Sequence, residues 1–170
     1  NDKTESLSQI TNFANSKNAD FFLSVHINSA SGTNGTGFES FIYNGSYSGK
    51  DKTKNIQKII HDAIINEVKS FGVTDRGKKE ANYHVLRETK MPALLTENLF
   101  INNPEDAKKL KSEKFIDSIA LGHAKGIAKA FNLTKKPEPK ENKQSNQPIK
   151  EGTIFYRVIT GSFSARANAN

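Results

Sequence analysis

The chain has 170 residues and a formal net charge of +7, from 25 Lys and Arg against 18 Asp and Glu, with a sequence pI of about 9.5. No window approaches the roughly 20 consecutive apolar residues that a membrane-spanning helix requires, so we expect no membrane insertion. The absence of cysteine excludes a disulfide framework, a thiolate metal site and a cysteine nucleophile. Any metal ion must therefore be held by His, carboxylate and water.

Hydrophobic periodicity alternates between helix and strand over the first 133 residues. Apolar residues at helical spacing predict helices over residues 7–18, 56–71 and 115–131. Asn103 followed by Pro104 is typical of the start of a further helix. Apolar runs predict strands over residues 21–27, 37–43 and 91–99, the first and last of them buried. Helices interleaved with buried strands indicate an α/β fold, a layered and largely parallel sheet flanked by helices.

The charge is unevenly distributed and marks a domain boundary. Residues 1–133 hold 18 basic and 15 acidic side chains (+3), whereas residues 134–170 hold 7 and 3 (+4). Residues 134–152 are rich in Lys and Pro, which is typical of a solvated linker. Residues 153–163 have the aromatic and β-branched density of a strand, and a helix start follows. We therefore expect a domain over 1–133, a linker over 134–152 and the start of a small α+β module over 153–170.

Two polar residues interrupt the most apolar strands, each near the carboxyl end. They are His26 in the first strand and Glu97 in the third. In open α/β sheets this end is where ligands gather. A buried carboxylate without a partner costs several kcal/mol, so Glu97 needs a partner, a metal ion or a chemical role. From residue types alone, the explanation favoured for His26 is a core histidine bonded to a backbone carbonyl. Glu97 is equally explained as a residue just clear of the core or as one member of an ion pair with a lysine.

Three segments together point to a family. Residues 18–30 (NADFFLSVHINSA) and 91–106 (MPALLTENLFINNPED) resemble two signature stretches of the zinc-dependent N-acetylmuramoyl-L-alanine amidases, the amidase-3 family of bacterial cell-wall hydrolases. Residues 83–89 (YHVLRET) resemble the segment that this family carries before the second stretch, and the resemblance covers about residues 4–132. It implies that His26 is a zinc ligand and that Glu97 is the catalytic glutamate.

The resemblance also implies an activity. It indicates a peptidoglycan hydrolase of the autolysin or endolysin type, located outside the cell or in the cell wall. Such an enzyme uses Zn²⁺ to activate water and cleaves the amide bond between N-acetylmuramic acid and the L-alanine of the stem peptide. The alternative is a non-catalytic cell-wall-binding or regulatory relative.

The chain departs from the family pattern in one respect. The family carries a further zinc-ligating His and a ligating Glu upstream of the segment that matches Asn1. We therefore expect an N-terminally truncated catalytic domain that binds zinc weakly and is inactive alone. The sequence favours core-edge or surface roles for His61 and His123, and leaves His84 as a candidate substrate contact.

The last residues carry a second, shorter resemblance. Residues 155–169 (FYRVITGSFSARANA) are similar to the opening of a SPOR-type peptidoglycan-binding repeat, and an unrelated strand followed by a turn is the alternative. The positive charge of residues 134–170 favours anionic wall polymers as partners. Nucleic acid is not expected as a partner, because residues 1–133 carry only +3 and show no basic stripe.

Overall fold

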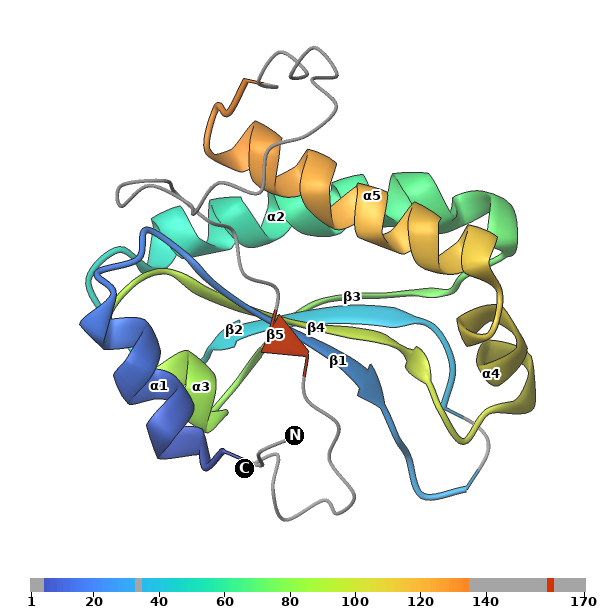
Figure 1. The fold of residues 1–170 in the computed structure, drawn as a ribbon, viewed down its shortest axis with the longest axis horizontal. Helices are drawn as coiled ribbons and strands as arrows, with labels where there is room; N and C mark the ends of the chain where they lie inside the picture. The colour runs from blue at the N-terminus through green and yellow to red at the C-terminus, as the bar shows by residue number, and fades with distance from the viewer. Residues whose placement is uncertain (1–4, 33–34, 135–158, 161–170) are drawn as a thin grey trace, which may run out of the picture.

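The computed structural model of the protein describes residues 5–32, 35–134 and 159–160. Figure 1 shows the course of the chain. In chain order the elements are α1 (Leu7–Ser16), β1 (Phe22–Asn28), β2 (Phe38–Tyr43), α2 (Lys50–Val68), a 3₁₀ turn η1 (Lys69–Phe71), β3 (Asp75–Ala81), α3 (His84–Arg87), β4 (Ala93–Phe100), α4 (Pro104–Leu110), α5 (Glu113–Ala130) and β5 (Ile159–Thr160).

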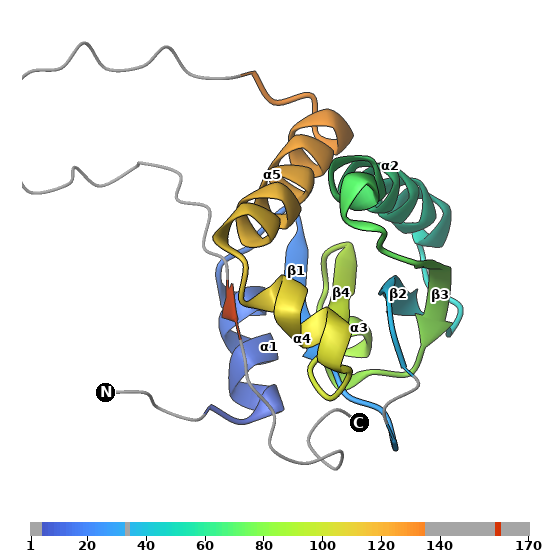
Figure 2. The same cartoon turned by 90° about the vertical axis from the view of Figure 1, so that its right-hand side faces the viewer.

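The strands form one sheet in the order β3-β2-β4-β1-β5. The pairs β1–β4, β1–β5 and β2–β3 are parallel, and β2–β4 is antiparallel. Helices cover both faces of this sheet (Figure 2). The predicted fold class, a largely parallel sheet flanked by helices, is confirmed.

Helices α2 and α5 lie side by side over one face and enclose the larger core (Figures 1 and 2). The side chains buried in it are Phe38, Ile42, Ile56, Ile60, Ile64, Val68, Leu94, Leu99, Phe115 and Ile119. Two glycines of α5 allow the helices to approach closely. A Cβ atom on Gly122 would lie 2.7 Å from Ile64 Cα, and one on Gly126 would lie 2.7 Å from Ile60 Cα.

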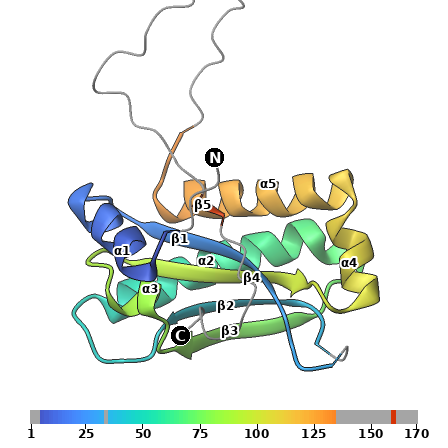
Figure 3. The ribbon, with the colours of Figure 1, turned by 60° about the horizontal axis from the view of Figure 1, so that its bottom comes forward.

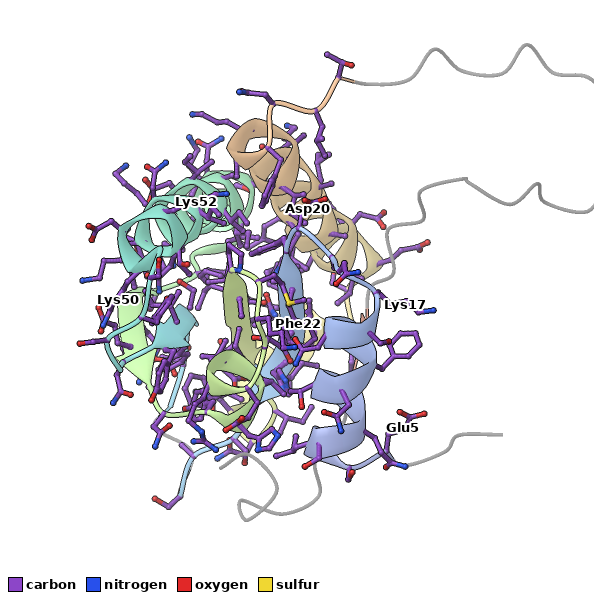
Figure 4. All side chains as sticks on the ribbon, turned by 90° about the vertical axis from the view of Figure 1, so that its left-hand side faces the viewer. Glu5, Lys17, Asp20, Phe22, Lys50 and Lys52 are labelled. Atoms are coloured by element: carbon purple, nitrogen blue, oxygen red, sulfur yellow. The ribbon has the colours of Figure 1, made fainter. Side chains whose placement is uncertain are left out.

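The opposite face of the sheet packs against α1 and α3 (Figure 3). Its buried side chains are Ala14, Phe22, Phe41, Val85, Leu86, Ala93 and Leu95. Figure 4 shows Phe22 among the side chains between the sheet and α1. Phe22, Phe41 and Leu95 come from three adjacent strands, and the strand alternation that buries them also determines which polar residues follow on the same face.

The predicted start of α4 agrees with the structure, and two elements were missed. Helix α4 begins after Asn103, whose side chain accepts hydrogen bonds from the backbone N–H groups of Glu105 and Asp106. The helix predicted over 56–71 begins earlier in the structure, at Lys50. The prediction missed its first turn because that turn carries no apolar residue. Strand β3 (DRGKKEA) was missed because it is a polar strand at the sheet edge, and α3 because it has only one turn.

The second predicted module falls almost entirely outside the described residues. The predicted linker over 134–152 has only Thr134 inside them. Ile159–Thr160, within the predicted strand over 153–163, form β5 and pair with Ser24 and Val25 of β1. A SPOR-type start therefore stays a prediction. Across the described residues, none of the helices has the length and apolar character needed to span a membrane.

Candidate active site

Three adjacent strands bring three titratable side chains into one row. His26 of β1 is the register partner of Glu97 in β4, and Glu97 is in turn the partner of Glu39 in β2. Cross-strand partners project from the same face of a sheet. Glu97 is two residues beyond Leu95 in β4, so the row follows directly on the core beneath α1 and α3. The structure thus brings together the two residues that the sequence singled out, and adds a third.

His26 is held in a half-buried position. Its Nε2 atom lies 2.6 Å from Ser24 Oγ, and its backbone carbonyl accepts a hydrogen bond from Asn98 Nδ2 at 2.9 Å. The β1–β4 register is irregular immediately after His26. Burial lowers the pKa of His26 to about 4, so the imidazole is neutral at neutral pH. Neutral imidazole is the form that binds a metal ion.

Glu97 has a buried carboxylate oxygen without a partner. Its Oε2 atom and Asn98 Oδ1 are the only two buried side-chain polar atoms without a hydrogen bond among the described residues. Burial, and after it the charge of Glu39, raises the pKa of Glu97 to about 8. A buried group that lacks a partner and has a strongly shifted pKa is typical of a functional site. Within the described residues, every ion pair of a lysine goes to a carboxylate other than Glu97.

Glu39 is more buried than Glu97 and has every oxygen bonded. Its side chain is 5% exposed. Asn28 Nδ2 donates to Oε1 at 2.8 Å, Arg76 Nε donates to Oε2 at 2.9 Å, and Lys79 Nζ contacts the same Oε2. The sequence analysis missed Glu39. The signal that identified Glu97, a carboxylate inside an apolar strand, is also present in Phe38-Glu39-Ser40-Phe41.

Two of the other histidines belong to the core. His61 lies 2.8 Å from Ser40 Oγ through Nδ1 and 2.9 Å from Asp75 Oδ1 through Nε2. His123 contacts Thr96 Oγ1 at 3.0 Å and the carbonyl of Ile119 at 2.8 Å. Both project from α2 and α5 into the interior, on the face of the sheet opposite to the row, and they are more deeply buried than the core-edge or surface role that the sequence favoured.

His84 lies elsewhere, at the start of α3. Its Nε2 atom is 3.5 Å from Thr11 Oγ1 of α1. A substrate contact for His84 stays a prediction. The two arginines of residues 1–133 both form ion pairs, Arg76 with Glu39, and Arg87 with Glu88 at 2.7 Å.

A loop organised by Asp106 supports the carboxyl end of β4. The buried Asp106 carboxylate accepts hydrogen bonds from the backbone N–H groups of Gly37 and Phe100, each at 3.1 Å, and from Thr36 Oγ1 at 2.9 Å. Gly37 has a φ of +102°, and a Cβ atom there would lie 2.3 Å from Thr74 O. This glycine therefore bends the chain into β2 just before Glu39.

The donors of the row match part of a metal site. Among the described residues, no group of three or more His, Asp or Glu side chains is arranged to hold a metal ion. His26 offers one neutral imidazole, and the unpartnered Glu97 oxygen next to it is free to act on a ligand of that ion. The row thus fits one metal ligand and one proton-transfer group.

Comparison with known proteins identifies the family. The model of the N-acetylmuramoyl-L-alanine amidase family (Amidase_3) matches residues 1–129. The chain belongs to this family. It is 47% identical over 169 residues to the N-acetylmuramoyl-L-alanine amidase CwlM of Bacillus licheniformis. This aligned region is 99% of this chain and 57% of CwlM. It is also 47% identical over 135 residues to the endolysin of Bacillus phage SPP1, covering 79% of this chain and 49% of the endolysin.

Solved structures of amidases share the fold. The N-acetylmuramoyl-L-alanine amidase from Clostridium difficile 630 superposes with a TM-score of 0.71 and 32% identity, covering 79% of this chain and 70% of that one. The catalytic domain of CwlV from Bacillus (Paenibacillus) polymyxa var. colistinus gives a TM-score of 0.70 and 29% identity, with the same coverage. The chain spans about half the length of the curated relatives it matches, 57% and 49% for the two named above.

Proposed function

We propose that residues 1–133 are catalytic-domain sequence of a peptidoglycan hydrolase that cleaves the amide bond between N-acetylmuramic acid and the L-alanine of the stem peptide. The observation that carries this proposal is the buried, unpartnered Glu97 carboxylate beside the neutral His26 imidazole. Membership of the amidase family supports the reaction type. The names of the relatives, an amidase and an endolysin, support the substrate.

In this proposal His26 is a ligand of Zn²⁺ and Glu97 transfers the proton. When bound, Zn²⁺ would lower the pKa of a water molecule and polarise the scissile carbonyl. Glu97 accepts a proton from the water that attacks the carbonyl carbon and passes it to the amide nitrogen, whose bond to that carbon then breaks. The products are a carboxylate on the muramic acid side and a peptide with a free amine on L-alanine. Burial strengthens the hold of the carboxyl group on the proton in transit, and the positive charge of a bound Zn²⁺ would favour the ionised carboxylate that accepts this proton.

The test is the release of new N-terminal L-alanine from purified peptidoglycan in the presence of Zn²⁺. Because the described residues contain no set of three metal donors, a second arm uses a chimera in which residues 1–129 replace the matching segment of CwlM. We expect Glu97→Gln to abolish release by the chimera, and Glu105→Gln to leave release unchanged. Glu105 is the matched control because its exposed carboxylate pairs only with Lys108 on the surface of α4. A Glu97→Gln chimera with full activity would remove Glu97 from the mechanism.

The second candidate is a non-catalytic wall-binding or regulatory relative. It is favoured by the incomplete donor set of the described residues. This candidate predicts that the wild-type chimera sediments with peptidoglycan but releases no N-terminal L-alanine. Either candidate acts in the cell wall or outside the cell, with anionic wall polymers as partners of the basic residues 134–170.

A further inference from the structure

Two cationic side chains of the edge strand β3 converge on one buried carboxylate oxygen. Arg76 and Lys79 of β3 both contact Oε2 of Glu39. Arg76 also lies over the ring of Phe100, 5.0 Å from its centroid, and Lys79 lies 5.8 Å from the centroid of Phe41. These three charged residues, Glu39, Arg76 and Lys79, are called the Glu39 cluster below.

The Glu39 cluster carries one positive charge more than it needs. A single cation neutralises a buried carboxylate, and here two cations share it. Within the described residues neither Arg76 nor Lys79 has another acidic partner. Their side chains are 34% and 37% exposed, so part of each head group faces solvent. The cluster can therefore accept one more anionic group without losing the bonds that satisfy Glu39.

The Glu39 cluster lies close to Glu97, the proposed proton-transfer group. Glu39 and Glu97 are cross-strand partners, and β2 separates β4 from β3. Neighbouring strands are about 4.8 Å apart, so the cationic head groups that reach back to Glu39 lie between about 5 and 10 Å from the Glu97 position. An extended peptide advances about 3.3 Å per residue. The side-chain carboxylate of the residue after the cleaved L-alanine spans a comparable distance.

We propose that Arg76 and Lys79, held by Glu39, bind the carboxylate of an acidic residue that follows L-alanine in the peptide substrate. This inference deepens and rests on the proposed function, because it assigns the peptide side of the cleaved bond to the β2–β3 edge of the site. Glu39 is the positioning residue, because both cations are held by its Oε2 atom. An acidic peptide is favoured over a neutral one by an ion pair in a half-buried setting.

The test measures the binding of peptides to the 170-residue chain in the absence of Zn²⁺, with NMR chemical shifts of the backbone amides as the readout. The probes are acetyl-L-alanyl-glutamyl amide and its neutral analogue acetyl-L-alanyl-glutaminyl amide, in which a carboxamide replaces the carboxylate. We expect the wild-type chain to bind the acidic peptide about 10-fold more tightly, a preference worth about 1.4 kcal/mol. Lys79→Gln should reduce this preference to about 2-fold or less, while Arg76 and Asn28 still satisfy Glu39.

Two variants separate binding from folding. Lys79→Arg keeps the charge and should keep the preference. Lys78→Gln is the matched control, because Lys78 lies next in β3 but pairs with Asp62 of α2 at 2.9 Å. Equal affinities of the wild-type chain for the two peptides, absence of binding of either, or equal losses in Lys78→Gln and Lys79→Gln would each overturn the inference. Because no hydrolysis is measured, failure of the proposed enzymatic activity would leave this result unaffected, and a hydrolase without the preference would refute only this inference.

Discussion

Glu97 and Glu39 face each other across the antiparallel pair β4–β2, and they differ in how their charge is compensated. Glu39 has a donor on each oxygen, whereas Oε2 of Glu97 has none among the described residues. The charge of Glu39 also raises the pKa of Glu97. Two adjacent carboxyl groups in such different environments can take different roles, which here are a structural role for Glu39 and, in the proposed mechanism, proton transfer by Glu97.

Replacing Glu97 by Gln should stabilise the fold at alkaline pH. The pKa of Glu97 is about 8 in the folded chain, against an ordinary value of 4.5 for glutamate, so the folded state holds its proton to a higher pH than the unfolded state. The contribution of Glu97 to stability is therefore present below pH 4.5 and is lost as the pH rises toward 8. We expect Glu97→Gln to exceed the wild-type free energy of unfolding at pH 8 by roughly 2–4 kcal/mol, measured by urea denaturation.

The difference should vanish at pH 4, where the wild-type carboxyl group is protonated in both states. Glu105→Gln, on the exposed surface of α4, serves as the control and should change little at either pH. A Glu97→Gln variant with the wild-type stability at pH 8 would mean that Glu97 is compensated by a group that the described structure lacks.

Replacing Glu39 by Gln should have the opposite effect. The change removes the charge that satisfies Arg76 and Lys79 and leaves two cations together at a half-buried position. Breaking a buried ion pair by removing one partner destabilises a protein by about 3–5 kcal/mol, and the partial exposure of the cations reduces this to roughly 2–3 kcal/mol. The measurement is urea denaturation at pH 7 in low salt. A loss below 0.5 kcal/mol would show that solvent already compensates these charges.

Zinc binding by the 170-residue chain should be weak. Within the described residues His26 is not joined by two further donors in a cluster, and one imidazole does not retain Zn²⁺. We expect well under one Zn²⁺ per chain after dialysis, measured by elemental analysis. The zinc content of Glu97→Gln should equal that of the wild-type chain, because Glu97 is proposed as the proton-transfer group and not as a ligand. One Zn²⁺ retained per chain would contradict this expectation, and loss of that zinc in His26→Ala would then locate it.

The sequence predicted the elements whose residues are apolar and missed those whose residues are polar. β1, β2, β4 and the three longest helices follow from hydrophobic periodicity because each buries a face. Strand β3 carries almost no apolar residue, and its place at the edge depends on pairing with β2 and on the bonds of Arg76 and Lys79 to Glu39. Such long-range contacts leave no local pattern.

The site divides in the same way. His26 and Glu97 were identified because each interrupts an apolar strand in a segment that resembles a known family. Glu39 interrupts β2 in the same manner, but its meaning depends on register: only the pairing of β2 with β4 places it opposite Glu97. Sequence spacing cannot supply that register.

Gly126→Ala should destabilise the protein although alanine favours helices. In an exposed helix this change would gain about 1 kcal/mol. Here the new methyl group would lie 2.7 Å from Ile60 Cα, so α5 must move away from α2 and open the larger core. We expect a net loss of roughly 1–3 kcal/mol in thermal or urea unfolding. Ala120→Gly, at an exposed position of α5, is the control for helix propensity and should cost about 1 kcal/mol. A stabilised Gly126→Ala variant would refute the close helix packing.

Buried histidines should make the fold sensitive to mild acid. Burial lowers the pKa values of His61 and His123 below the ordinary histidine value of 6.5, so the unfolded chain takes up protons first as the pH falls. Their contribution to stability is therefore present above pH 6.5 and is lost below it, by up to about 1.4 kcal/mol per pH unit for each histidine. Glu97 acts in the opposite direction between pH 4.5 and 8, so the slope is best measured in Glu97→Gln.

In that background we expect the free energy of urea unfolding to fall steadily from pH 6.5 to pH 5. Adding His123→Gln, whose amide can still bond to Thr96 Oγ1, should reduce the slope because one proton uptake is removed. His26 titrates in the same direction, since burial lowers its pKa to about 4, and it contributes to the slope that remains. A flat profile between pH 6.5 and pH 5 would mean that these imidazoles take up protons without unfolding, and that the bonds of His123 to Thr96 and Ile119 tolerate the charged form.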